Sequence, residues 1–174
     1  MNSRDYLLDT NTLSAFVRLK SGKSDPQCIS LDRALKDRIG ARIVLCPISV
    51  GELYRGARIA PDADILKDVD KIVESFTEIY SIDKAVAKDC YSELWARLFR
   101  KYAAKSKKSG SPGRIRMREL LTPTHTYDMQ VQENDLWLAA VAMCYKLVLV
   151  THDKMERLKT ISNGDVRFED WLST

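Results

Sequence analysis

Short apolar segments alternate with longer helical segments along the chain, and this order is the strongest constraint on its fold. The segments that favour strands are residues 4–8, 41–49, 77–82 and 146–151, with residues 166–171 as a candidate for one more. Apolar residues recur at helical spacing in the segments between them. Strands that are separated by helices pair in parallel and are covered on both faces. The sequence therefore predicts an α/β fold, with a central parallel sheet of about four to five strands between two layers of helices.

The helices are expected at residues 11–19, 26–40, 49–60, 61–76, 83–102 and 133–145. Two of them carry recognisable start signals. Asp25 followed by Pro26 fits an N-cap with proline at the first helical position, and Asp83 fits the N-cap of the long helix up to Tyr102. The helix at residues 133–145 is apolar nearly all round, which predicts a central position in the fold.

Length and composition indicate one soluble domain over residues 1–174, because 174 residues with 45% apolar and 30% charged side chains suffice for one sizeable core. The longest apolar run, Leu136–Tyr145, is too short to span a bilayer. Asp5 and Asp9 flank the only apolar patch near the N-terminus, which does not fit a signal peptide. We expect a cytoplasmic protein that has no membrane contact.

The four cysteines, Cys28, Cys46, Cys90 and Cys144, form no CxxC pair and stand among apolar residues. Zinc ligands and disulfide frameworks have characteristic cysteine spacings, and these are missing here. The expected role of the cysteines is therefore that of small buried apolar side chains.

Four acidic residues occupy corresponding places in the predicted sheet. Asp9 and Asp153 each follow a strand, Glu52 lies in the helix after the second strand, and Asp135 opens the central apolar helix. In parallel sheets the ligand site lies beyond the carboxyl ends of the strands. Converging carboxylates repel each other, and a divalent cation removes that cost. Oxygen ligands without a cysteine or histidine cluster suit Mg²⁺ or Mn²⁺.

Each acid also has a purely structural interpretation. Ser49 and Glu52 fit a capping box, with Ser49 as the N-cap of its helix. Asp135 favours the positive end of its helix dipole, Asp9 fits an Asx turn, and Asp153 fits an N-cap. These interpretations leave unexplained why all four acids stand at corresponding ends of successive units.

Several segments resemble the signature segments of PIN-domain ribonucleases, and more narrowly those of VapC-type toxins of bacterial toxin–antitoxin pairs. They are "YLLDTNTLSAF", "PISVGELYRGA", "ENDLWLAAVA" and "LVLVTHDK", and the closing "VRFEDWL" is similar to the last strand of that family. The segments appear in the order of the family and cover most of the chain. Two departures stand out: Met155 occupies a place where members often carry an aromatic residue, and the distance from Glu52 to Asp135 is longer than usual.

The resemblance implies that Asp9, Glu52, Asp135 and Asp153 form an acidic quartet that binds Mg²⁺ or Mn²⁺. It also implies metal-dependent endonucleolytic hydrolysis of RNA. Asp9, Glu52 and Asp135 would hold one metal, and Asp153 would help to hold a second or orient water. By the same resemblance, Asn11 supports the first acid, and Thr151 matches the hydroxyl residue that precedes the fourth. The implied partners are RNA, a small antitoxin protein and a second copy in a homodimer.

The excess length lies in a basic insertion at about residues 100–128. Eight cations and no acid stand between residues 100 and 118: Arg100, Lys101, Lys105, Lys107, Lys108, Arg114, Arg116 and Arg118. These residues are candidate RNA contacts, since lysine and arginine bind phosphates independently of sequence. The insertion could equally bind an acidic antitoxin or be a solvated loop. Arg55, three residues after Glu52, could pair with that acid or contact a phosphate.

Two other functions fit parts of the sequence. A phosphatase of the haloacid dehalogenase type also uses an aspartate at a strand end, but it needs a second acid two residues later, where this chain has Asn11. A PIN-like module that only binds RNA or protein needs no acidic quartet, and here all four acids are present. A metal titration separates this last alternative from a nuclease.

Overall fold

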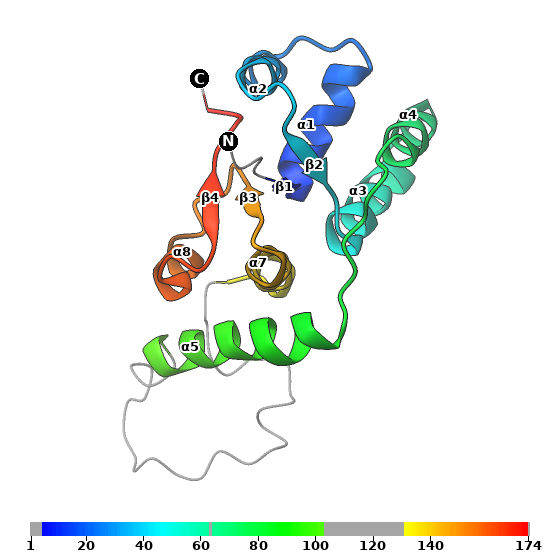
Figure 1. The fold of residues 1–174 in the computed structure, drawn as a ribbon. Helices are drawn as coiled ribbons and strands as arrows, with labels where there is room; N and C mark the ends of the chain where they lie inside the picture. The colour runs from blue at the N-terminus through cyan, green and yellow to red at the C-terminus, as the bar shows by residue number, and fades with distance from the viewer. Residues whose placement is uncertain (1–4, 63, 103–130, 174) are drawn as a thin grey trace.

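A four-stranded parallel sheet forms the centre of the fold (Figure 1). The computed structural model describes residues 5–62, 64–102 and 131–173. The strands are β1 (Asp5–Leu8), β2 (Arg42–Val44), β3 (Val148–Val150) and β4 (Arg167–Glu169), in the spatial order β2-β1-β3-β4. The prediction of an α/β fold with a parallel sheet is confirmed.

The helices connect these strands and cover both faces of the sheet. They are α1 (Thr10–Lys20), α2 (Pro26–Lys36), α3 (Pro47–Ile59), α4 (Asp64–Glu74), the π-helix η1 (Val86–Tyr91), α5 (Ser92–Tyr102), α7 (Glu133–Tyr145) and α8 (Glu156–Ser162). Figure 1 shows α5, α7 and α8 on one side of the strands and α1, α3 and α4 on the other.

Alternate residues of the strands enter two separate cores, as the period of two in a strand requires. Leu7 and Leu149 pack with α7, η1 and α5, whereas Leu8 and Val150 pack with α1, α3 and α4. The aromatic ring of Trp171 lies 4.9 Å from that of Tyr6 in the second core. The expected three layers are therefore present, and the sheet is buried on both faces.

The strand order places a topological switch point between β1 and β3. The chain leaves β1 for β2 on one side, and returns through β3 on the other side. Leu8 is paired with Val150 in register, so both strands end at the same level. A crevice at such a point, beyond the carboxyl ends of the strands, is where α/β sheets bind ligands.

Two local predictions need correction. The segment at residues 77–82 does not form a strand, because only Ile79 pairs with Leu45 in an isolated parallel bridge. The helix expected over residues 83–102 is continuous from residue 84, but its residues Val86–Tyr91 form the π-helix η1 before α5. The predicted caps are present, since Asp25 accepts from the backbone N of Cys28, and Asp83 accepts from that of Val86.

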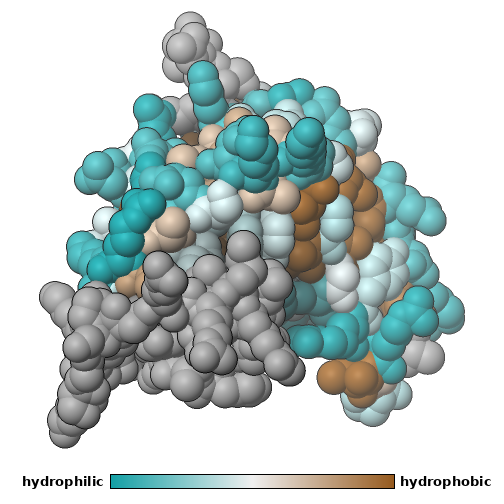
Figure 2. Space-filling model, turned by 90° about the horizontal axis from the view of Figure 1, so that it is seen from below, coloured by the Kyte–Doolittle hydropathy of each residue, from teal (hydrophilic) through white to brown (hydrophobic). Residues whose placement is uncertain are grey.

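In the coloured part of the face seen in Figure 2, hydrophilic residues predominate, and a few hydrophobic areas lie between them. Within the described ranges, no helix combines the length and apolar character that crossing a membrane requires. The cysteines are free thiols: Cys28, Cys46 and Cys90 are buried, as predicted, whereas Cys144 is only partly buried.

Candidate active site

Asp9 lies at the switch point, directly after β1. Its backbone N donates to the carbonyl of Val150 across the sheet at 3.0 Å, which fixes the residue between β1 and β3. Its side chain caps α1, because Oδ1 accepts from the backbone N of Thr12 at 2.7 Å. The side chain of Thr151 also hydrogen-bonds to this carboxyl group. Asp9 is only 2% exposed, so it is a buried acid held in place from the end of β3 and the start of α1.

Glu52 lies on α3 and lines the same cavity as Asp9. The contact that positions α3 there was not predicted from the sequence. The N-cap of α3 is Cys46, and the helix begins at Pro47. The buried Ser49 is inside the helix, and its hydroxyl donates to the carbonyl of Leu8 at 2.8 Å. The capping box of Ser49 and Glu52 is therefore wrong. Ser49 instead joins α3 to the end of β1, and this bond brings Glu52 alongside Asp9.

Asp135 and Asp153 are the other two acids of the group, and they come from α7 and from the segment after β3. Asp135 lies in the first turn of α7, where the helix dipole favours a negative charge. Asp153 follows β3, and its carboxylate accepts from the amide of Asn11 at 3.0 Å. The interpretation of Asp153 as an N-cap is wrong, because α8 begins at Glu156.

The four carboxylates line one cavity of about 320 Å³. The other residues that line it are Thr10, Asn11, Arg55, Gln132 and Leu138. Arg55 is the one basic side chain among the described residues of this lining, and it forms no ion pair with Glu52 in the described part of the chain. The structure thus brings the four predicted acids together, but Asn11 supports the fourth acid, Asp153, and not the first, as the resemblance implied.

Burial and mutual repulsion make two of these acids difficult to ionise. Burial is the main cause that raises the pKa of Asp9, and the charge of Asp153 adds to it. Burial also raises the pKa of Asp135 to about 6, followed by repulsion from the three other acids. A group of carboxylates that disfavours its own negative charge has a strong affinity for a cation that neutralises it.

The donor set fits Mg²⁺ or Mn²⁺, since both prefer carboxylate oxygens. In the described ranges, no three acidic, histidine or cysteine side chains converge closely enough to enclose a metal ion. Neutral side chains hold Glu52, through Thr10 and Asn134, and Asp153, through Asn11. The four acids thus surround one cavity, and neutral side chains hold two of them in place.

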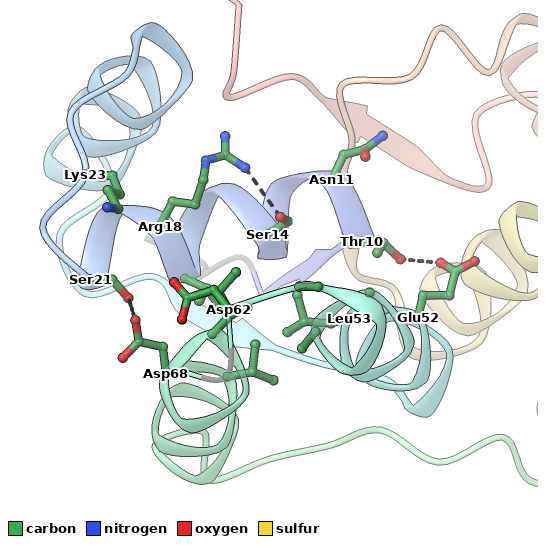
Figure 3. A pocket seen from close by; sticks show the side chains of 16 residues that line it. Thr10, Asn11, Ser14, Arg18, Ser21, Lys23, Glu52, Leu53, Asp62 and Asp68 are labelled. Atoms are coloured by element: carbon green, nitrogen blue, oxygen red, sulfur yellow. Dashed lines mark hydrogen bonds between the residues drawn. The ribbon is translucent and has the colours of Figure 1, made fainter.

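A larger cavity of about 510 Å³ lies beside the acidic one, between α1, α3 and α4. Figure 3 shows Thr10 and Asn11 of α1 at the end of this cavity next to Glu52, and Arg18 and Ser21 toward the other end. Its floor is apolar and includes Val17, Leu53, Ala57 and Val69. The two cavities share Thr10, Asn11 and Glu52 in their linings, so they adjoin each other.

The basic insertion is described only at its start. Arg100 and Lys101 lie exposed in the last turn of α5. The candidate RNA contacts Lys105, Lys107, Lys108, Arg114, Arg116 and Arg118 fall outside the described residues. His152, which is adjacent to Asp153, pairs with Asp170 at 3.1 Å on the surface.

Thr10 and Asn134 belong to the site but were not predicted. They stand directly beside Asp9 and Asp135 in the sequence, and both hydrogen-bond to Glu52. Their partner is 42 and 82 residues away, respectively, so no local pattern reveals these bonds.

The chain matches known proteins over nearly its whole length. The model of the PIN domain family matches residues 6–161. The fold resembles a chain of VapBC2 from Rickettsia felis bound to a promoter DNA fragment, with a TM-score of 0.61, 20% identity and coverage of 96% of this chain and 98% of that chain. It resembles equally a chain of VapBC-1 from nontypeable Haemophilus influenzae, with a TM-score of 0.62, 19% identity and coverage of 97% and 99%.

A chain of the DNA-bound VapBC from Salmonella typhimurium is also similar, with a TM-score of 0.62, 20% identity and coverage of 97% and 98%. At such identities the likeness shows a shared fold. No curated protein sequence matches the chain significantly. The family match extends over far more than half of the chain and includes all four acids. The chain therefore belongs to the PIN-domain family.

Proposed function

We propose that this protein is a metal-dependent endoribonuclease that hydrolyses RNA phosphodiester bonds, and that it is the toxin of a toxin–antitoxin pair. One observation carries the proposal: in a chain of the PIN family, Asp9, Glu52, Asp135 and Asp153 line a single cavity at the switch point of the sheet. The segments around these acids are those that resemble VapC-type toxins.

Asp9, Glu52 and Asp135 would hold Mg²⁺ or Mn²⁺, with Asp153 holding a second ion or orienting water. A metal bound there lowers the pKa of a bound water and stabilises the charge on the scissile phosphate. Asn11 orients Asp153 through its amide, and Thr151 hydrogen-bonds to Asp9. Arg55, at the rim of the cavity, is placed to orient a phosphate of the RNA.

The proposed partners follow from the same site. The similar structures from Rickettsia felis, Haemophilus influenzae and Salmonella typhimurium are VapBC assemblies. We infer that a cognate antitoxin covers the acidic cavity and the adjoining apolar floor between α1, α3 and α4. A homodimer in the cytoplasm completes the expected assembly, and the basic insertion is a candidate second contact for RNA or antitoxin.

The two alternative functions have less support. A haloacid dehalogenase-type phosphatase would use Asp9 as nucleophile and an acid at position 11, but Asn11 stands there and donates its amide to Asp153. Such an enzyme would also leave Glu52 and Asp135 without a role. A module that only binds RNA gains nothing from acids whose pKa values are raised by burial and by mutual repulsion.

Purified protein free of antitoxin should cleave bacterial RNA when Mg²⁺ or Mn²⁺ is added and should not cleave it in EDTA. The RNA fragments are separated on a gel, and their ends are mapped to show internal cuts. A phosphatase would release phosphate from small esters without cutting RNA, and a binding module would shift the RNA without cutting it. Cleavage that persists in EDTA would contradict metal dependence.

A further inference from the structure

The carboxylate of Glu52 is hydrogen-bonded on both oxygens by neutral side chains from two other helices. The Thr10 hydroxyl at the start of α1 donates to Oε2. The Asn134 amide in the first turn of α7 donates to Oε1 at 2.5 Å. Figure 3 shows the first of these bonds, with Thr10 and Glu52 facing each other across the gap between α1 and α3.

We propose that Thr10 and Asn134 are positioning residues that form a clamp on Glu52 and set its orientation for metal binding. The proposal rests on the proposed function, because the clamp acts through metal binding by Glu52. It assigns a role to two residues outside the acidic quartet. Neither residue needs to touch metal or RNA, because both act through the glutamate.

Neutral donors suit this task better than cations. A lysine or arginine on Glu52 would fix its orientation but neutralise the charge that attracts a divalent ion. A hydroxyl and an amide fix the carboxylate and leave its charge intact. Each carboxylate oxygen has two acceptor positions, so one donor on each oxygen leaves a position free for a cation. Partners of this kind orient ligands in metal sites, and their loss typically lowers metal affinity by about 10- to 100-fold.

The glutamate needs such a clamp more than the other acids do. Asp9 is short, buried, and held by the backbone at the end of β1. Glu52 is only half-buried on α3 and has a longer side chain with more rotamers to lose. Thr10 and Asn134 come from elements on either side of it, so together they restrict the side chain in two directions.

The end of α7 that carries Asn134 is itself firmly placed. The ring of Tyr91, the last residue of η1, stacks on Trp137 at 3.8 Å between centroids. The Tyr91 hydroxyl donates to Glu133, the residue before Asn134. The π-helix η1 thereby fixes the start of α7, and the clamp residue stands on a rigid support.

The test is the affinity of the purified full-length protein for Mn²⁺, measured by electron paramagnetic resonance without RNA. We expect Asn134→Leu and Thr10→Val each to weaken Mn²⁺ binding by about 10-fold or more. Thr10→Ser keeps the hydroxyl and should restore most of the affinity. In cleavage assays at fixed metal, the Asn134 and Thr10 variants should lower kcat more than they raise KM for RNA.

Tyr54→Phe is the matched control. It removes another hydroxyl-to-carboxylate hydrogen bond from α3, that of Tyr54 to Asp70 at 2.7 Å, away from the cavity. Its Mn²⁺ affinity should equal that of the wild type. Circular dichroism and thermal melting without metal verify that each variant is folded, and Thr10→Val provides a second test if Asn134→Leu does not fold.

Glu52→Gln separates failure of the clamp from failure of the proposed function. If Glu52→Gln loses Mn²⁺ binding while Asn134→Leu and Thr10→Val bind like the wild type, the clamp is wrong and the metal site stands. If Glu52→Gln itself binds Mn²⁺ like the wild type, both the clamp and the metal site are wrong. Equal weakening by Tyr54→Phe would also contradict the clamp.

Discussion

Replacing Asp9 with asparagine is expected to reduce RNA cleavage by about 10³-fold or more, equivalent to about 4 kcal/mol of transition-state stabilisation. Asparagine has nearly the same shape and can still accept the hydrogen bond from Thr12, so α1 keeps a good N-cap. Only the negative charge is lost, and with it the acid at the centre of the cavity. The measurement is the single-turnover cleavage rate of a labelled RNA with Mn²⁺.

Asp25→Asn is the matched control for this variant. Asp25 is likewise an N-cap aspartate, on α2, and it accepts from the backbone N of Cys28 at 3.0 Å. It does not line the acidic cavity. We expect Asp25→Asn to retain the wild-type cleavage rate, although the loss of its ion pair with Arg18 lowers stability. If Asp9→Asn cleaves RNA as fast as Asp25→Asn does, Asp9 is not a catalytic residue.

Replacing Asp135 with asparagine should abolish cleavage and yet stabilise the metal-free protein at pH 7.5. Burial and three nearby acids raise the pKa of Asp135 from 3.8 to about 6, so its ionised form is disfavoured in the folded state. The stability of the wild type therefore falls as the pH rises from about 4 to about 6, and stays low above that range. Asparagine carries no charge, so the variant does not lose stability over this pH range.

The expected gain of Asp135→Asn is about 1–2 kcal/mol after allowance for solvent screening, or about 3–6 °C in Tm. It should shrink as the pH is lowered toward 4. Added Mn²⁺ should raise the Tm of the wild type but not that of the variant, because a ligand stabilises only the state that binds it. The measurement is thermal unfolding in EDTA and in Mn²⁺ across this pH range.

Asp83→Asn provides the contrasting case. Hydrogen bonds, chiefly from the backbone N of Val86, lower the pKa of Asp83, so its ionised form stabilises the fold. Its replacement should lower the Tm at pH 7.5 or leave it unchanged. If Asp135→Asn behaves like Asp83→Asn, then the acids of the cavity do not repel each other as the structure indicates.

The positions of the four acids could be predicted from the sequence because strand ends are visible in it. Asp9 and Asp153 each follow an apolar run that forms a parallel strand, and parallel strands end at one edge of the sheet. The topology then brings Glu52, in the second turn of α3, and Asp135, in the first turn of α7, to that edge. For these residues, local pattern and global fold agree.

The hydrogen-bond partners within the site could not be predicted in the same way. Ser49 has the spacing of a capping residue, and its actual partner is the carbonyl of Leu8, on a strand 41 residues earlier. The same holds for Thr10 and Asn134, whose partner lies on another helix. Residues 77–82 have the composition of a strand, but only one bridge forms there. Such contacts depend on where elements meet in space.

The most direct test of the site is anomalous diffraction from crystals of the antitoxin-free protein soaked in Mn²⁺. A manganese peak is expected in the acidic cavity, bonded to carboxylate oxygens of Asp9, Glu52 and Asp135, with Asp153 beside it or at a second peak. The same peak should be missing in crystals of Asp9→Asn. A cavity without manganese, at a concentration that supports RNA cleavage, would contradict the assignment of these acids as the metal site.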